Sequence, residues 1–253
     1  MTSTGNGMID LSMISVVIPA LNEEKHLPNC LSSLKAQKWT GELEVIVVDN
    51  GSTDNTSAVA TSHGATVVSC PKKGVAYARQ AGAEVAQGQI IVQADADTFY
   101  PPEWIGRIDG YFESHQNSAG LAGRYEYTDP AWWVPAERVY RRTLNALGYV
   151  FFRWPASVSG ANFAFRRSAF IQAQGYDPNS LYPDQWGIAR RVSRYGRVDY
   201  DHSSVVITSP RRVAKPTLVI GCEIVCNCGH VGWHFVKHCV RQIKKTVVRS
   251  AAT

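Results

Sequence analysis

The sequence predicts an open α/β sheet flanked by helices, parallel in its first half and mixed in its second. Apolar, β-branched runs alternate with helical patterns through residues 14–94. Such an alternation is typical of parallel strands joined by right-handed helical crossovers. The last of these runs, at 89–94, leads directly into Asp95 and Asp97. Because open α/β sheets bind ligands at the carboxyl ends of their strands, we expect function at this edge.

The first half contains strands and helices in strict alternation. Ile14–Ile18 is a β-branched run that ends before Pro19, which suits a buried strand. Asn22 is placed to cap the next helix, with two glutamates in its first turn. A dense turn signal at 49–54 follows the second strand. The predicted order is strand 14–18, helix to about 37, strand 42–48, helix 56–63, strand 65–69, helix 74–86 and strand 89–94.

The second half has fewer strand and helix repeats, which predicts a mixed sheet. Residues 131–156 are rich in aromatic side chains and arginine. A predicted helix begins at Asp184 and ends before Gly196. The predicted elements are helix 102–114, strand 119–127, strand 159–166, helix 168–173, helix 184–195 and strand 197–208.

The chain has 253 residues, which is enough for one domain with a sizeable core. We expect a loose tail at 1–12, a domain at 13–210 with halves 13–100 and 101–210, and a basic extension at 211–253. No run of about 18 apolar residues occurs, so no membrane-spanning helix is predicted. The net charge of +5 is too mild to require nucleic acid as a partner.

Carboxylates follow two of the predicted strands. Asp49 ends the second and Asp95 follows the fourth, and parallel strands bring both to one crevice. Asp95 and Asp97 can face one divalent cation, since Mg²⁺ and Mn²⁺ prefer oxygen ligands and keep positions open for substrate phosphates. Acidic residues also end strands as ordinary turn formers. The interpretation of Asp95 and Asp97 as a metal site therefore depends on support from other motifs in the sequence.

The six cysteines fall into two groups. Cys30 and Cys70 lie far apart in the part that carries the carboxylates, which suits a reducing cytosol. The others lie near the C-terminus among histidines that a helix would align on one face. No standard paired-cysteine spacing occurs there, so ordinary packing is favoured over a zinc site. This cluster consists of Cys222, Cys226, Cys228, Cys239, His230, His234 and His238.

Two segments, 132–154 and 231–248, combine basic with aromatic or apolar residues. In the second segment, Phe235, Ile243 and several valines can share one broad helical face that lysines and arginines flank. Such a helix can lie in the headgroup layer of an anionic membrane, at its cytoplasmic face. The alternative is that the same face docks on the protein's own core or on a second subunit.

Four stretches of the chain resemble a known family. They are 16–24 (VVIPALNEE), 47–56 (VVDNGSTDNT), 94–97 (ADAD) and 159–167 (SGANFAFRR). In this order they are similar to the inverting nucleotide-sugar glycosyltransferases of family two. The resemblance implies the GT-A fold, a Rossmann-like mixed sheet flanked by helices, as a single domain with a C-terminal helical extension. It makes 13–100 the nucleotide-binding half and 101–210 the acceptor half.

The resemblance also implies roles for matching positions. Asp49 would hydrogen-bond the base of the donor nucleotide, and Arg79 would contact the base or the diphosphate. Asp95 would lie near the ribose or the metal, and Asp97 would bind the metal that holds the diphosphate. Turn capping by Asp49 and a surface position for Arg79 are the alternatives. The remaining residues of the implied nucleotide pocket are Pro19, Ala20, Asn22 and Glu23.

The chain departs from the family at the proposed catalytic base. The family usually has Glu-Asp at the start of the late helix, and the Asp is the base. Here Asp184 stands between Pro183 and Gln185. Asp184 is therefore the implied base with a shift of one residue, or it serves acceptor binding. Capping of its own helix is the alternative.

The implied reaction is metal-dependent, inverting transfer of a sugar from a nucleoside-diphosphate sugar to an acceptor hydroxyl or lipid phosphate, in glycan or glycolipid biosynthesis. A UDP-sugar is preferred over a GDP-sugar, and Mn²⁺ or Mg²⁺ is the expected cofactor. A sugar nucleotidyltransferase would instead carry a glycine-rich basic loop where this chain has 19–24 (PALNEE). A non-catalytic nucleotide-sugar-binding protein is the other alternative, with Pro183 and Gln185 marking a decayed site.

Overall fold

The computed structural model describes residues 13–129, 132, 134–152, 154–177 and 184–212. By its internal contacts the chain divides into two units, Met1–Ser209 and Pro210–Thr253, and the first unit holds the sheet. In the second unit the described residues form a short 3₁₀ helix, Pro210–Arg212. The predicted tail at 1–12, the C-terminal Cys/His cluster and the basic segment at 231–248 lie outside the described residues.

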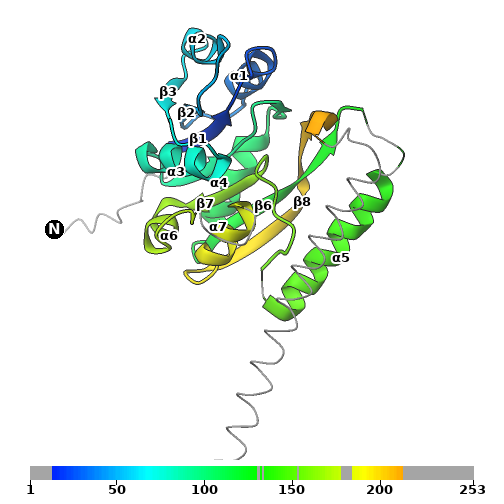
Figure 1. Cartoon of the computed structure of the whole chain (residues 1–253). Coiled ribbons are helices and arrows are strands. Elements are labelled where there is room, and N and C mark those ends of the chain that lie inside the picture. Colours follow the sequence, from blue (N-terminus) through cyan, green and yellow to red (C-terminus); the bar gives the residue numbers. More distant parts are fainter. Residues whose placement is uncertain (1–12, 130–131, 133, 153, 178–183, 213–253) are drawn as a thin grey trace, which may run out of the picture. The chain divides into compact units, whose positions relative to one another are not determined.

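The described residues form an eight-stranded mixed sheet in the order β3-β2-β1-β4-β7-β6-β8-β5 (Figure 1). The first four strands in this order run parallel, β7 is antiparallel to both of its neighbours, and β8 is parallel to β6 and antiparallel to β5. The predicted change from a parallel to a mixed sheet is therefore confirmed. The strands are β1 (Met13–Ala20), β2 (Glu42–Asp49), β3 (Thr66–Ser69), β4 (Ile90–Gln93), β5 (Thr98–Phe99), β6 (Ser118–Tyr127), β7 (Phe163–Arg166) and β8 (Arg197–Thr208).

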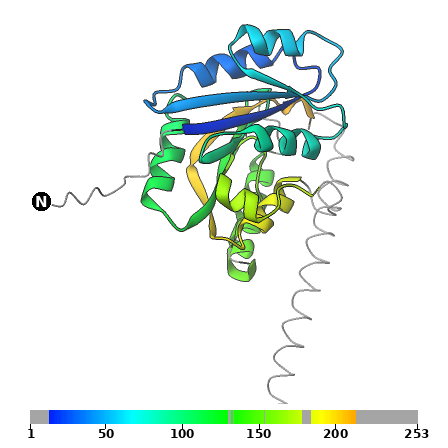
Figure 2. The ribbon, with the colours of Figure 1, turned by 90° about the vertical axis from the view of Figure 1, so that its left-hand side faces the viewer.

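Helices cover both faces of the sheet, with α1 and α2 on one side and α3, α6 and α7 on the other (Figure 2). The apolar side chains of α4 join the core under α1 and α2. The helices are α1 (Leu27–Lys35), α2 (Thr56–Ser62), α3 (Val75–Val85), α4 (Trp104–Ser114), α5 (Val134–Phe152), α6 (Arg167–Gln172) and α7 (Asp184–Val192).

Strand periodicity explains the two-sided core. Successive side chains of a strand point to opposite faces, so a central parallel strand must be apolar at every position. Val16 and Ile18 of β1 pack with α1, whereas Val17 packs with α3. In β2, Val47 packs on the side of α1 and Val48 on the side of α3. The continuous apolar runs in the sequence are the consequence.

α3 lies close to the sheet because Gly82 has no side chain. A methyl group at Gly82 would lie 2.4 Å from Cγ1 of Val17 and 2.8 Å from Cγ2 of Val48. Arg79 is three residues earlier and therefore shares the inward face of the helix. The close approach at Gly82 thus brings the guanidinium of Arg79 to the sheet.

One local expectation was wrong. Asn22 does not cap α1, which begins at Leu27 after His26. Asn22 instead adopts a left-handed backbone conformation with φ of 56°, and its Oδ1 accepts the N–H of Thr53 at 2.8 Å. Its side chain joins two loops and cannot reach a helix that starts five residues later. The aromatic, arginine-rich stretch, for which the sequence analysis predicted no element, forms α5.

The side chain of Asn162, just before β7, joins α4, β6 and β8. Its side chain is 3% exposed, and its Oδ1 accepts the indole N–H of Trp104 in α4 at 2.9 Å. Its Nδ2 donates to the carbonyl of Arg124 in β6 at 2.8 Å and to that of Ser204 in β8 at 3.1 Å. Asn162 thereby fixes the turn that precedes β7.

We predict that Asn162→Ala lowers the free energy of unfolding by about 2–3 kcal/mol, because it leaves buried polar groups without partners. Urea unfolding followed by tryptophan fluorescence measures the change. Asn117→Ala, at an exposed position, is the matched control and should alter stability by less than about 0.5 kcal/mol. Equal losses in the two variants would contradict the role of the buried amide.

Candidate active site

The loops after β1 and β2 are tied to each other at the carboxyl edge of the sheet. The N–H of Asn22 donates to Oγ of Ser52 at 3.0 Å, opposite the bond from Thr53 to Asn22. The N–H of Glu23 donates to Oγ1 of Thr56 at 2.8 Å. These cross-loop bonds hold the implied nucleotide pocket, which includes Asn22 and Glu23, in one arrangement.

Asp49 ends β2 and lies opposite Ala20 of β1. Its carboxylate accepts the N–H of Ser52 at 2.8 Å and the hydroxyl proton of Ser57. Burial opposes ionisation, but hydrogen bonds from Ser57 and Ser52 outweigh it and hold the pKa of Asp49 below its usual range. Asp49 is therefore an ionised acceptor at neutral pH. It does close the turn, while binding of a nucleotide base stays a prediction.

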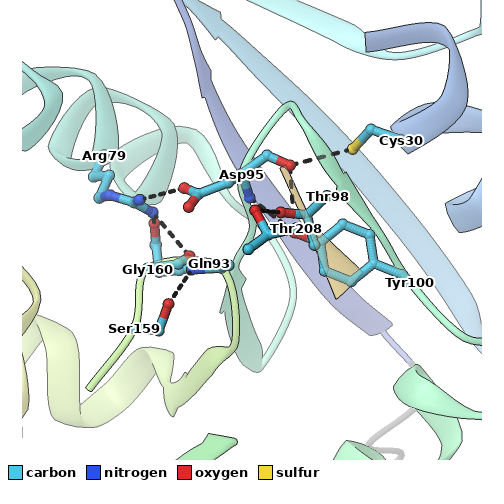
Figure 3. Close-up of polar contacts among 10 residues, drawn as sticks. Cys30, Arg79, Gln93, Asp95, Thr98, Tyr100, Ser159, Gly160 and Thr208 are labelled. Atoms are coloured by element: carbon cyan, nitrogen blue, oxygen red, sulfur yellow. Dashed lines mark hydrogen bonds and ion pairs between the residues drawn. The ribbon is translucent and has the colours of Figure 1, made fainter. Parts of the chain in front are cut away.

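Asp95 follows β4 and forms an ion pair with Arg79 of α3 (Figure 3). Nη2 of Arg79 lies 2.8 Å from Oδ1 of Asp95, and the two side chains are 4% and 21% exposed. Nη1 of Arg79 donates to Oε1 of Gln93 at 2.8 Å and to the carbonyl of Gly160 at 3.3 Å. The alternative that Arg79 lies on a helix surface is therefore wrong. Its guanidinium orients Asp95, and a contact with the donor stays a prediction.

The backbone of Asp95 is held from the other side (Figure 3). The hydroxyl of Tyr100 accepts the N–H of Asp95 at 2.8 Å and donates to its carbonyl at 3.4 Å. The thiol of Cys30 donates to the same carbonyl at 3.5 Å. Burial, with further contributions from Cys30 and Asp95, raises the pKa of Tyr100, so its hydroxyl keeps its proton. Backbone and carboxylate of Asp95 are thus both fixed.

Asp97 brings a second carboxylate to this turn. Burial raises the pKa of the Cys30 thiol, and the charges of Asp95, Asp97 and Glu23 raise it further. Negative charge therefore gathers at this edge. No group of three or more His, Cys, Asp or Glu side chains among the described residues could hold a metal ion. Two carboxylates would hold a divalent cation only in part, with substrate phosphates as its further ligands, which is usual for Mg²⁺. Binding of a cation by Asp95 and Asp97 stays a prediction.

The turn before β7 and the first turn of α7 meet the Arg79–Asp95 pair. A methyl group at Gly160 would lie 2.2 Å from Nη2 of Arg79 and 3.0 Å from Nε2 of Gln185. Gln185 is 5% exposed, and α7 begins one residue before it, at Asp184. The late helix therefore starts beside the carboxylate turn. The structure does not describe the side chain of Asp184, so its role stays a prediction.

Several residues that build this edge escaped the sequence analysis. Gln93 is a fully buried amide in β4, and its position in an apolar run was the available signal. Gly160 is required by the close approach of Arg79, which no local pattern reveals. Cys30 and Tyr100 contact the backbone of Asp95 from positions that are apolar in the sequence pattern. These four residues support Arg79 and Asp95.

The mixed sheet, its two helical layers and the carboxylate turn at its edge define the chain as an α/β transferase of the GT-A type. The family model described as Glycosyl transferase family 2 matches residues 15–173, more than half of the chain. The chain belongs to this family, and the resemblance inferred from the sequence motifs is confirmed.

Curated relatives are named as glycosyltransferases. Glycosyltransferase AglE of Haloferax volcanii is 31% identical over 194 residues, which cover 72% of this chain and 59% of that protein. An undecaprenyl-phosphate 4-deoxy-4-formamido-L-arabinose transferase of Shewanella sediminis is 29% identical over 148 residues, or 55% of this chain and 45% of that protein. The chain therefore spans less than two thirds of the length of either relative.

Solved structures share the fold. Glucosyl-3-phosphoglycerate synthase from Mycobacterium tuberculosis, in complex with Mn²⁺, uridine diphosphate and glucosyl-3-phosphoglycerate, superimposes with a TM-score of 0.62 at 24% identity. The match covers 86% of this chain and 80% of that one. This likeness establishes the GT-A fold, and the low identity limits it to the fold.

We predict that Arg79→Met lowers the free energy of unfolding by about 1–3 kcal/mol, because Asp95 loses its charged hydrogen bond. Chemical unfolding measures the change. Arg194→Met, at an exposed position of the chain, is the control and should have almost no effect. Unchanged stability of Arg79→Met would show that the ion pair does not hold this edge together.

Proposed function

We propose that the protein moves a sugar, with inversion, from a nucleoside-diphosphate sugar to a hydroxyl or phosphate of a glycan or lipid-linked acceptor. The observation that carries this proposal is the turn of Asp95 and Asp97 at the carboxyl edge of β4, held by Arg79 and beside the start of α7. Membership in Glycosyl transferase family 2 supports glycosyl transfer over nucleotidyl transfer and over a non-catalytic binding role.

The donor nucleotide would lie over the loops that follow β1 and β2. Asp49 would accept an N–H of the base, since its low pKa keeps it ionised. Asn22 and Glu23 would line the pocket from a loop that hydrogen bonds already fix. Pro19 and Ala20, at the end of β1, would form its floor. A uracil base is preferred over guanine.

Mn²⁺ or Mg²⁺ would be held by Asp97 with Asp95, and when bound it would offset the charge that develops on the leaving diphosphate. Arg79 keeps the carboxylate of Asp95 directed within the site at a 2.8 Å contact. The Mn²⁺ in the neighbouring structure supports a divalent cofactor. The carboxylates of Asp95 and Asp97 would thus be in position before the donor binds.

Asp184 would take the proton of the acceptor hydroxyl as that oxygen attacks the anomeric carbon from the side opposite the diphosphate. This displacement needs no covalent intermediate on the enzyme. The start of α7 next to Gly160 and Arg79 supports this role, because an acceptor bound there would lie beside the donor diphosphate. An acceptor phosphate is already ionised and would need no base, and Asp184 would then serve acceptor binding.

The acceptor would be glycan or lipid-linked, and the protein would act at the cytoplasmic face of a membrane in polysaccharide or glycolipid synthesis. The name of the Shewanella relative, an undecaprenyl-phosphate transferase, supports a lipid phosphate. Free thiols at Cys30 and Cys70 support a reducing compartment. None of the described helices is long and apolar enough to span a bilayer.

We predict that Asp97→Asn keeps the fold and removes most of the Mn²⁺- or Mg²⁺-dependent transfer, because the cation loses a charged ligand. Release of nucleoside diphosphate from a panel of UDP- and GDP-sugars, with titrated Mn²⁺, measures this. Glu113→Gln, at an exposed position of α4, is a control for loss of one surface carboxylate. Activity near that of the unmodified protein, with unchanged metal dependence, would remove Asp97 from the site.

We predict that Asp49→Ala weakens binding of the nucleoside diphosphate by about 1.5–3 kcal/mol, because a charged hydrogen bond to the base is lost. Titration calorimetry with UDP and GDP in the presence of Mn²⁺ measures the change. Ser57→Ala, which removes a partner of Asp49 and leaves its carboxylate in place, should weaken binding less. Unaltered affinity in Asp49→Ala would exclude base binding by this residue.

A further inference from the structure

The outward face of α5 carries an apolar stripe. Val139 is 64% exposed, Leu147 is 47% exposed and Val150 is 74% exposed, and Trp132 just before the helix is 81% exposed. Positions 139, 143, 146, 147 and 150 repeat with helical spacing and share one face. These exposed fractions mean that the described residues leave the stripe uncovered.

The inward face of α5 fixes this orientation. The side chain of Arg141 points from α5 toward Tyr125 of β6 and is 11% exposed. Its Nε is 2.7 Å from Oε1 of Glu137. Tyr125 of β6 donates to the same carboxylate at 2.9 Å, and the guanidinium of Arg141 stacks over its ring at 4.0 Å. The helix lies beyond β6 and β8 in the ribbon (Figure 1). Rotating the apolar stripe inward would break this buried network.

The charge on the outward side of α5 is positive. Arg142 is exposed on the stripe, and Arg138 lies on its flank, 3.4 Å from Glu126 and 40% exposed. The acidic residue of this helix, Glu137, is turned inward against Arg141. The helix therefore offers apolar side chains and cations together, with no carboxylate of its own on that side.

We propose that the outward face of α5 binds the surface of an anionic membrane. A second copy of the chain fits less well, because it would bring the same two arginines, Arg138 and Arg142, to a helix face that has no carboxylate of its own. The basic segment 231–248 fits less well for the same reason, since its lysines and arginines would meet those of α5. Anionic headgroups attract the cations, while the valines and Trp132 enter the interface, where tryptophan is enriched.

This inference rests on the proposed function and names the surface that serves it. From α5 the chain runs through residues 154–159 to Gly160, whose carbonyl accepts from Arg79 at 3.3 Å. The helix that would contact the membrane is thus connected by a short segment to the turn beside Asp95. Binding of this helix to a bilayer would hold the protein on the membrane that carries a lipid-linked acceptor.

Co-sedimentation of the full chain with liposomes tests the proposal, with phosphatidylglycerol in phosphatidylcholine against phosphatidylcholine alone. The full chain should bind only the anionic liposomes, and less at high salt. Val139→Glu with Val150→Glu should lower the partition coefficient about tenfold or more. Arg142→Gln should lower it roughly fivefold. Val85→Glu with Ile171→Glu, on exposed valine and isoleucine side chains of α3 and α6, is the matched control and should bind as the unmodified chain does.

Binding is measured without sugar transfer, so the result does not depend on the proposed activity. Stabilisation of each variant by UDP with Mn²⁺ reports the donor site separately and should be equal in all of them. The proposal is overturned if Val139→Glu with Val150→Glu keeps its liposome binding, or if the unmodified chain fails to bind anionic liposomes. Self-association that this double variant abolishes, seen by analytical ultracentrifugation, would assign the face to a second copy instead.

Discussion

The ion pair between Arg79 and Asp95 is the constraint around which the functional edge is built. A buried guanidinium is costly unless its charge and its N–H groups all find partners. Asp95 supplies the charge at 2.8 Å, and Gln93 and Gly160 accept the remaining contacts. This requirement explains a buried amide inside an apolar strand and a glycine where a side chain would collide with the guanidinium. The charge of Arg79 therefore constrains residues on two other segments of the chain, residues 93–95 and the turn before β7.

Sheet topology brings those segments together. Parallel strands deliver the loops after β1, β2 and β4 to one edge, where Asp49 and the turn of Asp95 and Asp97 lie. Insertion of β7 beside β4, in the antiparallel sense, places the turn before β7 at that same edge. Gly160 thus reaches Arg79 although β4, β5, α4, β6 and α5 lie between them in the sequence. The two halves of the domain meet along β4 and β7, and the site lies at this junction.

The second half of the domain uses buried polar contacts for a different purpose. Asn162 holds β6, β8 and α4 in register, and Glu137 with Arg141 and Tyr125 holds α5 against the sheet. Polar networks of this kind specify one arrangement, because any other leaves their members without partners. Since Glu137 and Arg141 face inward, Val139, Leu147 and Val150 on the opposite side of α5 face outward. The network that fixes the helix thereby also creates its exposed apolar surface.

The sequence by itself determined the order of the elements other than β5 and α5, the parallel first half, the mixed second half and the carboxylates at the edge. It could do so because strand periodicity, turn chemistry and the motif at 94–97 are local properties of the chain. Tertiary structure decided that Asn22 joins two loops in place of capping a helix, and that Arg79 is buried on Asp95. It also decided which face of α5 is exposed. These outcomes depend on partners distant in sequence, whose approach is set by packing.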